Sequence, residues 1–98
     1  MTKKESFFQS NLIRQLKEMF PGCIVLKNDP NYLQGFPDII ILYGRNWAAL
    51  EIKRSSDENH QPNQDYYIDL TDNMSFGAFI FPENKLQVLN ELQQAFRS

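Results

Sequence analysis

The sequence predicts an α/β fold in which a mixed four-stranded sheet is flanked by helices. Three observations support this class. Segments with helical periodicity open and close the chain, short apolar runs mark the strands, and turn-forming residues separate the elements. Taken in order, the elements read αβββαβα. A chain of 98 residues is long enough for one domain of this kind with its own hydrophobic core.

The first helix is predicted from about Lys3 to Phe20. Its apolar residues recur at helical spacing, at Phe8, Leu12, Leu16, Met19 and Phe20. Thr2 and Glu5 match a capping box, in which each side chain accepts a backbone N–H at the start of the helix. Pro21 and Gly22 end the helix.

Three strands follow. Residues 23–27 form an apolar run that ends in the turn-forming residues 28–31. A loop containing Gly35 leads to residues 38–43, whose continuous apolar character is typical of a central strand. Gly44, Arg45 and Asn46 have the chemistry of a turn, so residues 47–53 are interpreted as the second arm of a hairpin.

The rest of the chain predicts a helix, a strand and a final helix. Pro62 suits the first turn of a helix that runs to about Asn73. Residues 76–81 read as a buried strand, which the chain should reach through a right-handed crossover that makes the sheet mixed. The last helix, 82–96, has an apolar stripe formed by Val88, Leu89, Leu92 and Phe96.

The register of the hairpin decides whether two acidic residues meet. If Gly44 and Arg45 form its tip, Asp38 lies opposite Glu51, and directly paired side chains share a face. Lys53, two residues beyond Glu51, lies on that face as well. If the loop also includes Asn46, the register shifts by one residue and the match fails unless a bulge restores it. The sequence leaves both registers open.

Two facing carboxylates repel each other unless a cation lies between them. Mg²⁺ usually takes one or two carboxylates together with waters and substrate phosphate, so Asp38 and Glu51 are candidate ligands. Such an ion polarises a scissile phosphate, and Lys53 would orient the attacking water or offset developing charge. On spacing alone, an ordinary ion pair between Glu51 and Lys53 is the commoner arrangement. Both residues, however, close a strand that is otherwise apolar, where charge is costly.

Two more residues are candidates for the same site. Helical spacing places Glu5 near the stripe of Leu12 and Leu16, so it is interpreted as a helix cap, a metal ligand or both. Gln64 lies on the face of its helix that should pack on the sheet, where it would hydrogen-bond Lys53 or a phosphate. A simple polar residue in the first turn is an equally good interpretation of Gln64.

Other features carry less weight. The net charge is −2 and the ten basic residues are scattered, whereas nucleic-acid binders usually carry a basic surplus. His60 lies in a polar loop and is expected to be solvated rather than a catalytic base. Four aromatic residues have the chemistry to stack on bases, but core packing is the expectation for all of them: Tyr32, Phe36, Tyr66 and Tyr67.

Localisation is inferred from what the sequence contains. The longest apolar run is too short to cross a bilayer, and the first residues lack the apolar segment of a secretory signal. Cys23 is the single cysteine and cannot form an internal disulfide, which suits a reducing compartment. We therefore expect a cytoplasmic protein.

The pattern formed by these residues resembles the PD-(D/E)xK nuclease superfamily. Gly35-Phe36-Pro37-Asp38 is followed by Glu51-Ile52-Lys53 inside an αβββαβ order, and Gln64 on the next helix is similar to the small VRR-NUC branch, which includes stand-alone nucleases of this size. The resemblance runs from Glu5 to Phe81. It implies a restriction-endonuclease-like αβββαβ core with an extra C-terminal helix, so that residues 1–98 form a single nuclease domain.

The resemblance also implies an activity and a set of roles. Asp38 and Glu51 would hold Mg²⁺ or Mn²⁺ with the Ile52 carbonyl as a further ligand, and Lys53 would be the catalytic lysine. Members of this kind are metal-dependent endonucleases that act on branched or flapped DNA, and the stand-alone ones resemble homodimers that cut four-way junctions.

Two points of the resemblance stay open. Glu5 would match the first-helix acid and Gln64 the helix glutamine, although Gln61 competes for the second role. Two alternative functions are retained: a nuclease-fold module that binds DNA without cutting it, and a non-enzymatic interaction protein whose charges only form ion pairs.

Overall fold

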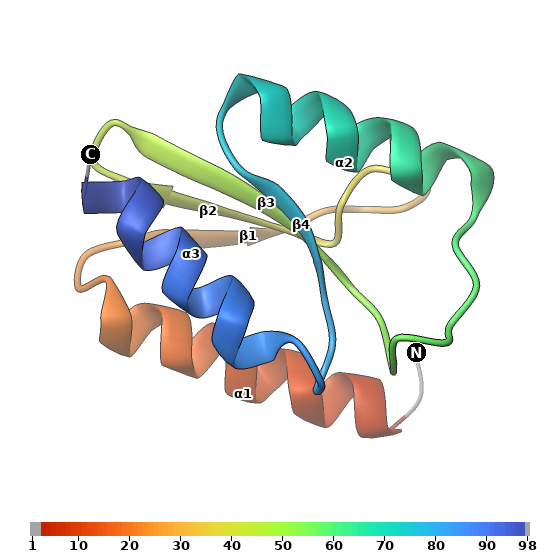
Figure 1. Ribbon diagram of the computed structural model, residues 1–98, viewed down its shortest axis with the longest axis horizontal. Coiled ribbons are helices and arrows are strands. Elements are labelled where there is room, and N and C mark those ends of the chain that lie inside the picture. The colour runs from red at the N-terminus through yellow and green to blue at the C-terminus, as the bar shows by residue number, and fades with distance from the viewer. Residues whose placement is uncertain (1–2, 98) are drawn as a thin grey trace.

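The computed structural model describes residues 3–97, and its elements follow the predicted order. Figure 1 shows them as helix α1 (Lys3–Met19), strands β1 (Ile24–Lys27), β2 (Ile39–Tyr43) and β3 (Asn46–Ile52), helix α2 (Pro62–Met74), strand β4 (Gly77–Ile80) and helix α3 (Lys85–Arg97). The predicted capping residue Thr2 lies outside the described residues.

The last helix begins later than the sequence suggested. Helix α3 starts at Lys85 rather than at Pro82, because the residues between β4 and α3 form a turn. In that turn the Phe81 backbone N–H donates to Asn84 Oδ1 at 2.9 Å, and the Asn84 backbone N–H donates to the Phe81 carbonyl at 3.1 Å. The side chain of Asn84 therefore competes with helix formation at this point.

The four strands form one mixed sheet in the order β1-β2-β3-β4. Strands β1 and β2 are antiparallel, as are β2 and β3, whereas β3 and β4 are parallel. The parallel pair is connected through α2, as a crossover requires. The α/β class and the mixed four-stranded sheet predicted from the sequence are confirmed.

The structure also decides the hairpin register. Tyr43 pairs with Asn46 and Ile39 pairs with Leu50, so the tip consists of Gly44 and Arg45 and the strand includes Asn46. Gly44 has a φ of 60°, the left-handed conformation that a two-residue hairpin turn requires at its first position. Continued by one residue beyond the last ladder pair, Ile39 and Leu50, this register sets Asp38 opposite Glu51.

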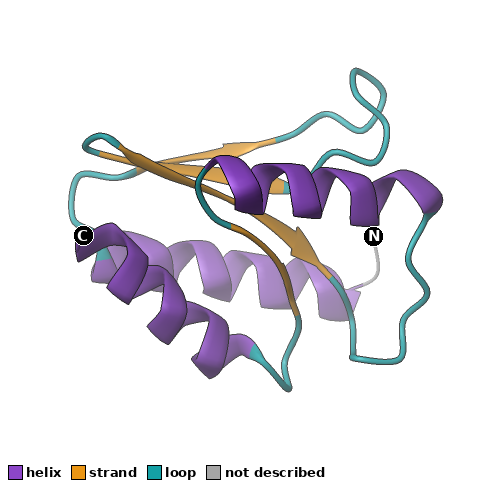
Figure 2. Ribbon diagram, turned by 45° about the horizontal axis from the view of Figure 1, so that its top comes forward, coloured by secondary structure: helices purple, strands orange, loops and turns teal. Residues whose placement is uncertain are grey.

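The sheet separates two unequal layers of helices. Helices α1 and α3 cover one face and α2 lies alone on the other, as Figures 1 and 2 show from two directions. The hydrophobic core lies between the sheet and the α1–α3 layer; its sheet residues are Ile39, Ile41, Ala48, Leu50, Ile52 and Ile80. Because side chains alternate along a strand, Glu51 and Lys53 are directed to the α2 face.

Helix α2 packs closely on β3 and β4. The close approach depends on Gly77, where a Cβ atom would collide with the side chain of Thr71 and with the carbonyl of Ile68. This contact fixes the helix over the part of the sheet that carries Glu51 and Lys53. No helix within residues 3–97 combines the length and the apolar character needed to span a lipid bilayer.

Candidate active site

Asp38 is held at the point where the chain enters β2. The preceding Pro37 is fully buried, and the Asp38 carbonyl accepts the Asn28 backbone N–H at 2.8 Å. Its carboxylate reaches across to β3, where Oδ2 accepts the backbone N–H of Ile52 at 2.8 Å. The side chain is thus fixed beside the last residues of β3, as the hairpin register predicts.

Glu51 faces Asp38 in a buried environment. Its side chain is 5% exposed, and Oε2 accepts the side-chain amide of Gln64 at 3.2 Å. Burial, followed by the charge of Asp38 and a hydrogen bond between the two carboxyl groups, raises the pKa of Glu51 to about 9. Without a cation, Glu51 therefore keeps its proton at neutral pH. A cation bound between Asp38 and Glu51 would keep both carboxyl groups ionised.

Lys53 lies beside the two acids but is not paired with Glu51. Its ammonium, 3% exposed, donates to Gln64 Oε1 at 2.6 Å and to the Asn59 carbonyl at 3.2 Å. Among the described residues, the carboxylate within ion-pair distance of Lys53 Nζ is that of Glu58, at 3.8 Å. The ordinary interpretation, a Glu51–Lys53 ion pair, does not describe this site.

Gln64 connects the acids to the lysine. Its carbonyl oxygen accepts Lys53 Nζ and, at 2.9 Å, the backbone N–H of Gln61, while its amide donates to Glu51. The contact with Gln61 caps the first turn of α2, so the Gln64 side chain both caps the helix and contacts the residues of the site. Of the two competing glutamines, Gln64 is the one whose side chain contacts both Glu51 and Lys53.

Glu5 lies at the same end of β3, on the helix that covers the other face of the sheet. Its Oε1 is 3.8 Å from Arg54 Nε. Together with Phe8, Lys53, Arg54 and Pro82 it lines a cavity of about 100 Å³. Within the described part of the chain, no three side chains among the acids, histidines and cysteines gather into a metal-binding group. A role for Glu5 as a metal ligand stays a prediction.

The loop between β3 and α2 adds residues that sequence analysis did not single out. The carbonyl of Asn59 accepts Lys53, and Glu58 lies between Lys53 and Arg54. Burial alone would raise the pKa of Glu58, but hydrogen bonds from the Arg54 backbone and guanidinium lower it below its ordinary value. A polar loop without periodicity gives no sequence signal for such contacts.

His60 is more constrained than expected. Its ring stacks on Phe79 with centroids 4.0 Å apart, and Nδ1 lies 2.8 Å from Asp65 Oδ1. Phe79 is the β4 partner of Glu51. The imidazole is therefore packed at the margin of the site, although 34% of its side-chain surface stays exposed.

The donor set fits a divalent cation. Two carboxylates from neighbouring strand ends match the one or two acidic ligands that Mg²⁺ commonly takes in proteins. The raised pKa of Glu51 agrees with this fit, because a bound cation would favour the ionised form of a carboxyl group that burial and Asp38 keep protonated. The side chains of Asp38 and Glu51 are thus brought together, with Lys53 and Gln64 beside them, and Ile52 contacts Asp38 through its backbone N–H. The Ile52 carbonyl as a ligand stays a prediction.

Comparisons with known proteins support the fold. No protein-family model and no curated protein matches the sequence. Solved structures match the fold, and two of them are described here. One, described as a "VRR_NUC domain", has a TM-score of 0.70 and 19% identity, covering 94% of this chain and 97% of its own. The other, a "VRR_NUC domain protein", has a TM-score of 0.65 and 16% identity, covering 93% of this chain and 88% of its own. The chain therefore has the fold of VRR_NUC domain structures, as its motifs predicted.

Proposed function

We propose that this protein is a divalent-metal-dependent DNA endonuclease that hydrolyses phosphodiester bonds in branched DNA, such as flaps or four-way junctions. One observation carries the proposal: Asp38 and Glu51 face each other in a buried site whose electrostatics favour a cation. The VRR_NUC names of the structural neighbours agree with a nuclease.

The roles of the acids follow from their contacts. Asp38, Glu51 and the Ile52 carbonyl would hold Mg²⁺ or Mn²⁺, which when bound supplies positive charge and polarises the scissile phosphate. Glu51 must release its proton for this, and the Gln64 amide keeps its Oε2 oriented. The Ile52 N–H fixes Asp38 in the same way. Glu5, at the same end of β3, is proposed as the outer acid of the site.

Lys53 would stabilise the charge that develops on the phosphate during attack. Its ammonium is already immobilised by Gln64 and by the Asn59 carbonyl, so little reorganisation is needed when substrate binds. A fixed cation in a site shielded from water contributes more than a mobile one at the surface. These contacts support the role proposed for Lys53.

The proposal extends to partners and location. A domain of this size offers little surface for gripping two arms of a junction, so we propose that two copies act together as a homodimer in the cytoplasm. Bound divalent ions would offset the net charge of −2 near the DNA backbone.

A cleavage panel tests the function. Linear, flapped and four-way DNA are incubated with the protein and Mg²⁺, Mn²⁺ or Ca²⁺. We expect nicking of branched DNA with Mg²⁺ and Mn²⁺, binding alone with Ca²⁺, and no cutting by Glu51→Ala. A Glu51→Ala protein that cuts as fast as the wild type would refute the proposal. DNA binding without cleavage under every condition would favour the non-cutting module instead.

A further inference from the structure

The basic residues that look scattered in the sequence gather along helix α1 in the fold. Of the ten, α1 contains four: Lys3, Lys4, Arg14 and Lys17. Two more lie against the helix from other elements. Arg54 Nε is 3.8 Å from Glu5 Oε1 in the first turn of α1, and Lys85 Nζ is 5.7 Å from the centroid of the Phe8 ring. Most of the basic residues of the chain are therefore in α1 or in contact with it.

The opposite face of the molecule is acidic. Helix α2 contains Asp65, Asp69 and Asp72 and no lysine or arginine, so its side chains carry a charge of −3. Helix α1 has four basic and two acidic residues, which gives +2. Because these helices cover opposite faces of the sheet, charge is unequally divided between the two faces (Figure 1). A polyanion at the end of β3 is therefore repelled by α2 and attracted toward α1.

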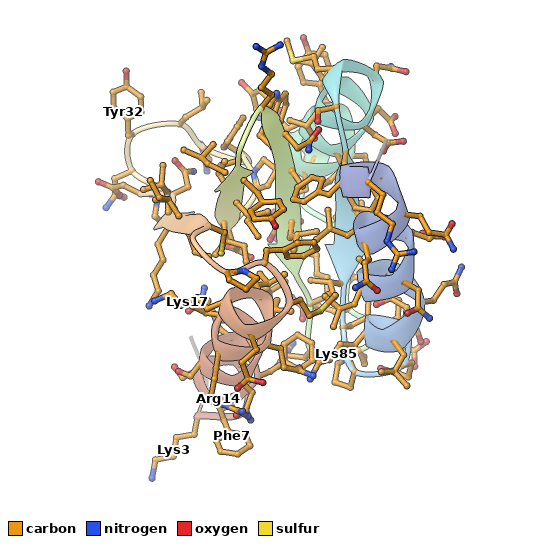
Figure 3. All side chains as sticks on the ribbon, turned by 90° about the vertical axis from the view of Figure 1, so that its left-hand side faces the viewer. Lys3, Phe7, Arg14, Lys17, Tyr32 and Lys85 are labelled. Carbon is orange, nitrogen blue, oxygen red and sulfur yellow. The ribbon has the colours of Figure 1, made fainter. Side chains whose placement is uncertain are left out.

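The outer side of α1 carries a row of exposed residues that we call the basic stripe: Lys3, Phe7, Arg14 and Lys17. At roughly 100° per residue, these four positions lie within an arc of about 80° around the helix axis. Figure 3 shows Lys3, Phe7 and Arg14 extending from α1 on the side turned away from the sheet. At about 1.5 Å per residue the stripe is about 21 Å long, which equals the rise of about six base pairs of DNA.

The basic stripe begins next to the proposed catalytic residues. Glu5, in the first turn of α1, lines the cavity of about 100 Å³ that Lys53 and Arg54 also line. From this end the stripe follows the helix to Lys17, two residues before α1 ends at Met19. A DNA arm that leaves the site on the α1 side can therefore follow the stripe.

Glu18 lies beside the stripe but does not hold Arg14 firmly. The Arg14 guanidinium is 3.1 Å from the Glu18 carboxylate, and both side chains are more than half exposed. Exposed ion pairs of this kind contribute little to stability. The guanidinium can thus exchange the carboxylate for a DNA phosphate, with which arginine forms two parallel hydrogen bonds.

Phe7 gives the stripe an aromatic surface. Its ring is 71% exposed, whereas the neighbouring Phe8 packs against the core. Surfaces that bind single-stranded DNA combine basic side chains for the phosphates with aromatic rings on which unpaired bases stack. Flapped DNA supplies such bases, so Phe7 between two basic residues has the chemistry to bind its unpaired strand.

Other exposed aromatic residues provide a comparison. Core packing, expected for Tyr32 and Tyr66, is wrong, because Tyr32 is 86% exposed and Tyr66 is 62% exposed. Tyr32 points away from the body of the protein in Figure 3, and Tyr66 lies on the acidic helix α2. Phe36 and Tyr67 pack their rings against each other, with centroids 5.4 Å apart. Tyr66 is therefore an exposed ring without the basic surroundings of Phe7.

The chemistry of α1 favours DNA over an anionic membrane. Leu12 and Leu16 are fully buried in the core, so α1 has no continuous apolar face left to enter a bilayer. A membrane would also require no connection between the stripe and the site at the end of β3. Charge arranged in a row that begins at the proposed cleavage site is what a DNA arm requires.

We propose that the basic stripe holds a DNA arm beside the cleavage site, with its three basic side chains on phosphates and the Phe7 ring on an unpaired base. The inference rests on the proposed function, because it names the surface that holds the substrate of the same site. It is measured as binding in Ca²⁺, so the two ideas can fail separately. DNA that is bound through the stripe but not cut in Mg²⁺ would contradict only the proposed function. Stripe variants that bind and cut flapped DNA like the wild type would contradict only this inference.

Fluorescence anisotropy of labelled flapped DNA in Ca²⁺ tests the basic residues. Lys3→Gln, Arg14→Gln and Arg45→Gln each remove one exposed positive charge, and Arg45 is the matched control because it lies at the hairpin tip, at the other end of β3 from the site. Over roughly 50–200 mM salt, Lys3→Gln and Arg14→Gln should weaken binding about three- to tenfold and reduce the slope of log K against log salt by about one. Arg45→Gln should keep the wild-type slope. Equal slopes in the three variants, or a wild type that does not bind, would overturn the inference.

Phe7→Ala and Tyr66→Ala test the stacking contact. Phe7→Ala should lower the affinity for flapped DNA about tenfold and leave the affinity for a fully paired duplex of the same length unchanged. Tyr66→Ala, the matched control on the acidic helix, should change neither affinity. Sedimentation with vesicles of phosphatidylcholine and phosphatidylserine should show no binding of the wild type. A Phe7→Ala protein with wild-type affinity for flapped DNA, or vesicle binding that Lys3→Gln abolishes, would overturn the inference.

Discussion

At the scale of single residues, the burial of Glu51 disfavours the ionised carboxylate that metal binding would require. A carboxylate in this position loses hydration and faces Asp38, so its proton is retained to about pH 9. Glu51 in this position therefore lowers the free energy of unfolding of the cation-free protein. Such a cost is typical of a group kept for binding or catalysis rather than for folding.

This cost predicts the effect of Glu51→Gln on the free energy of unfolding. Below pH 4.5 the carboxyl is protonated in both folded and unfolded wild type, so the variant should gain little. As the pH rises toward 9 the unfolded state ionises first, the folded state binds more protons, and wild-type stability falls. With a chelator present, Glu51→Gln should be more stable than the wild type by about 1–2 kcal/mol at pH 8. Urea denaturation at pH 4 and pH 8 measures this, and a difference independent of pH would contradict it.

Replacing Gln64 should lower the stability instead of raising it, because its side chain supplies hydrogen bonds that the site cannot replace. In Gln64→Ala the ammonium of Lys53 loses its shortest hydrogen bond and Glu51 loses its amide donor. We expect a loss of about 1–3 kcal/mol in stability and a fall in kcat of roughly 10–100-fold. Asn63→Ala, one residue earlier and exposed, is the control and should change neither quantity. Equal behaviour of the two variants would show that Gln64 is only a helix residue.

At the scale of elements, the hairpin and helix α2 assemble the site. The two-residue tip at Gly44 and Arg45 sets the register that brings Asp38 to Glu51. The contact at Gly77 then sets how closely α2, with Gln64 in its first turn, approaches β3 and β4. The site depends on these two backbone features, because the register brings Asp38 to Glu51 and the position of α2 brings Gln64 to Glu51 and Lys53.

Gly77→Ala tests the second feature. The added methyl group would meet Thr71 and Ile68, so α2 must shift away from β4. We expect a loss of about 1–3 kcal/mol and a loss of cleavage by the protein that remains folded, since Gln64 shifts with the helix. Gly22→Ala is the comparison: no atom lies within 4 Å of its new Cβ, but its φ of 88° is strained for alanine. It should lose stability and keep its specific activity. A Gly77→Ala protein with full specific activity would show that α2 is not positioned by this contact.

The elements also show which features a sequence makes predictable. Turn-forming residues and short apolar runs predict the hairpin and the crossover, because these follow from local chemistry. The placement of Asp38, Glu51 and Lys53 on one face then follows from strand alternation. The fit of Asn59 and Glu58 around Lys53 does not, because loop contacts depend on tertiary packing. The exposure of Tyr66 was missed for a related reason: helical spacing identifies an apolar stripe but not what covers it.

At the scale of the whole molecule, cation binding should be coupled to folding. An ion that binds the native Asp38–Glu51 pair stabilises the folded state by mass action. At about one hundred times the dissociation constant the gain is about 2.7 kcal/mol, which for a domain of this size raises Tm by roughly 10 °C or more. The gain should increase from pH 6 to pH 9, because Glu51 must lose its proton to bind the ion.

Thermal unfolding with and without Mn²⁺ or Mg²⁺ measures this coupling in the wild type, Asp38→Asn, Glu51→Gln and Glu18→Gln. Glu18 is a matched control, because it is an exposed acid paired with Arg14 at 3.1 Å. The wild type and Glu18→Gln should gain stability with either ion, and the two site variants should not. If all four proteins respond equally, the ions bind elsewhere, and the two acids cannot form the metal centre that the proposed nuclease requires.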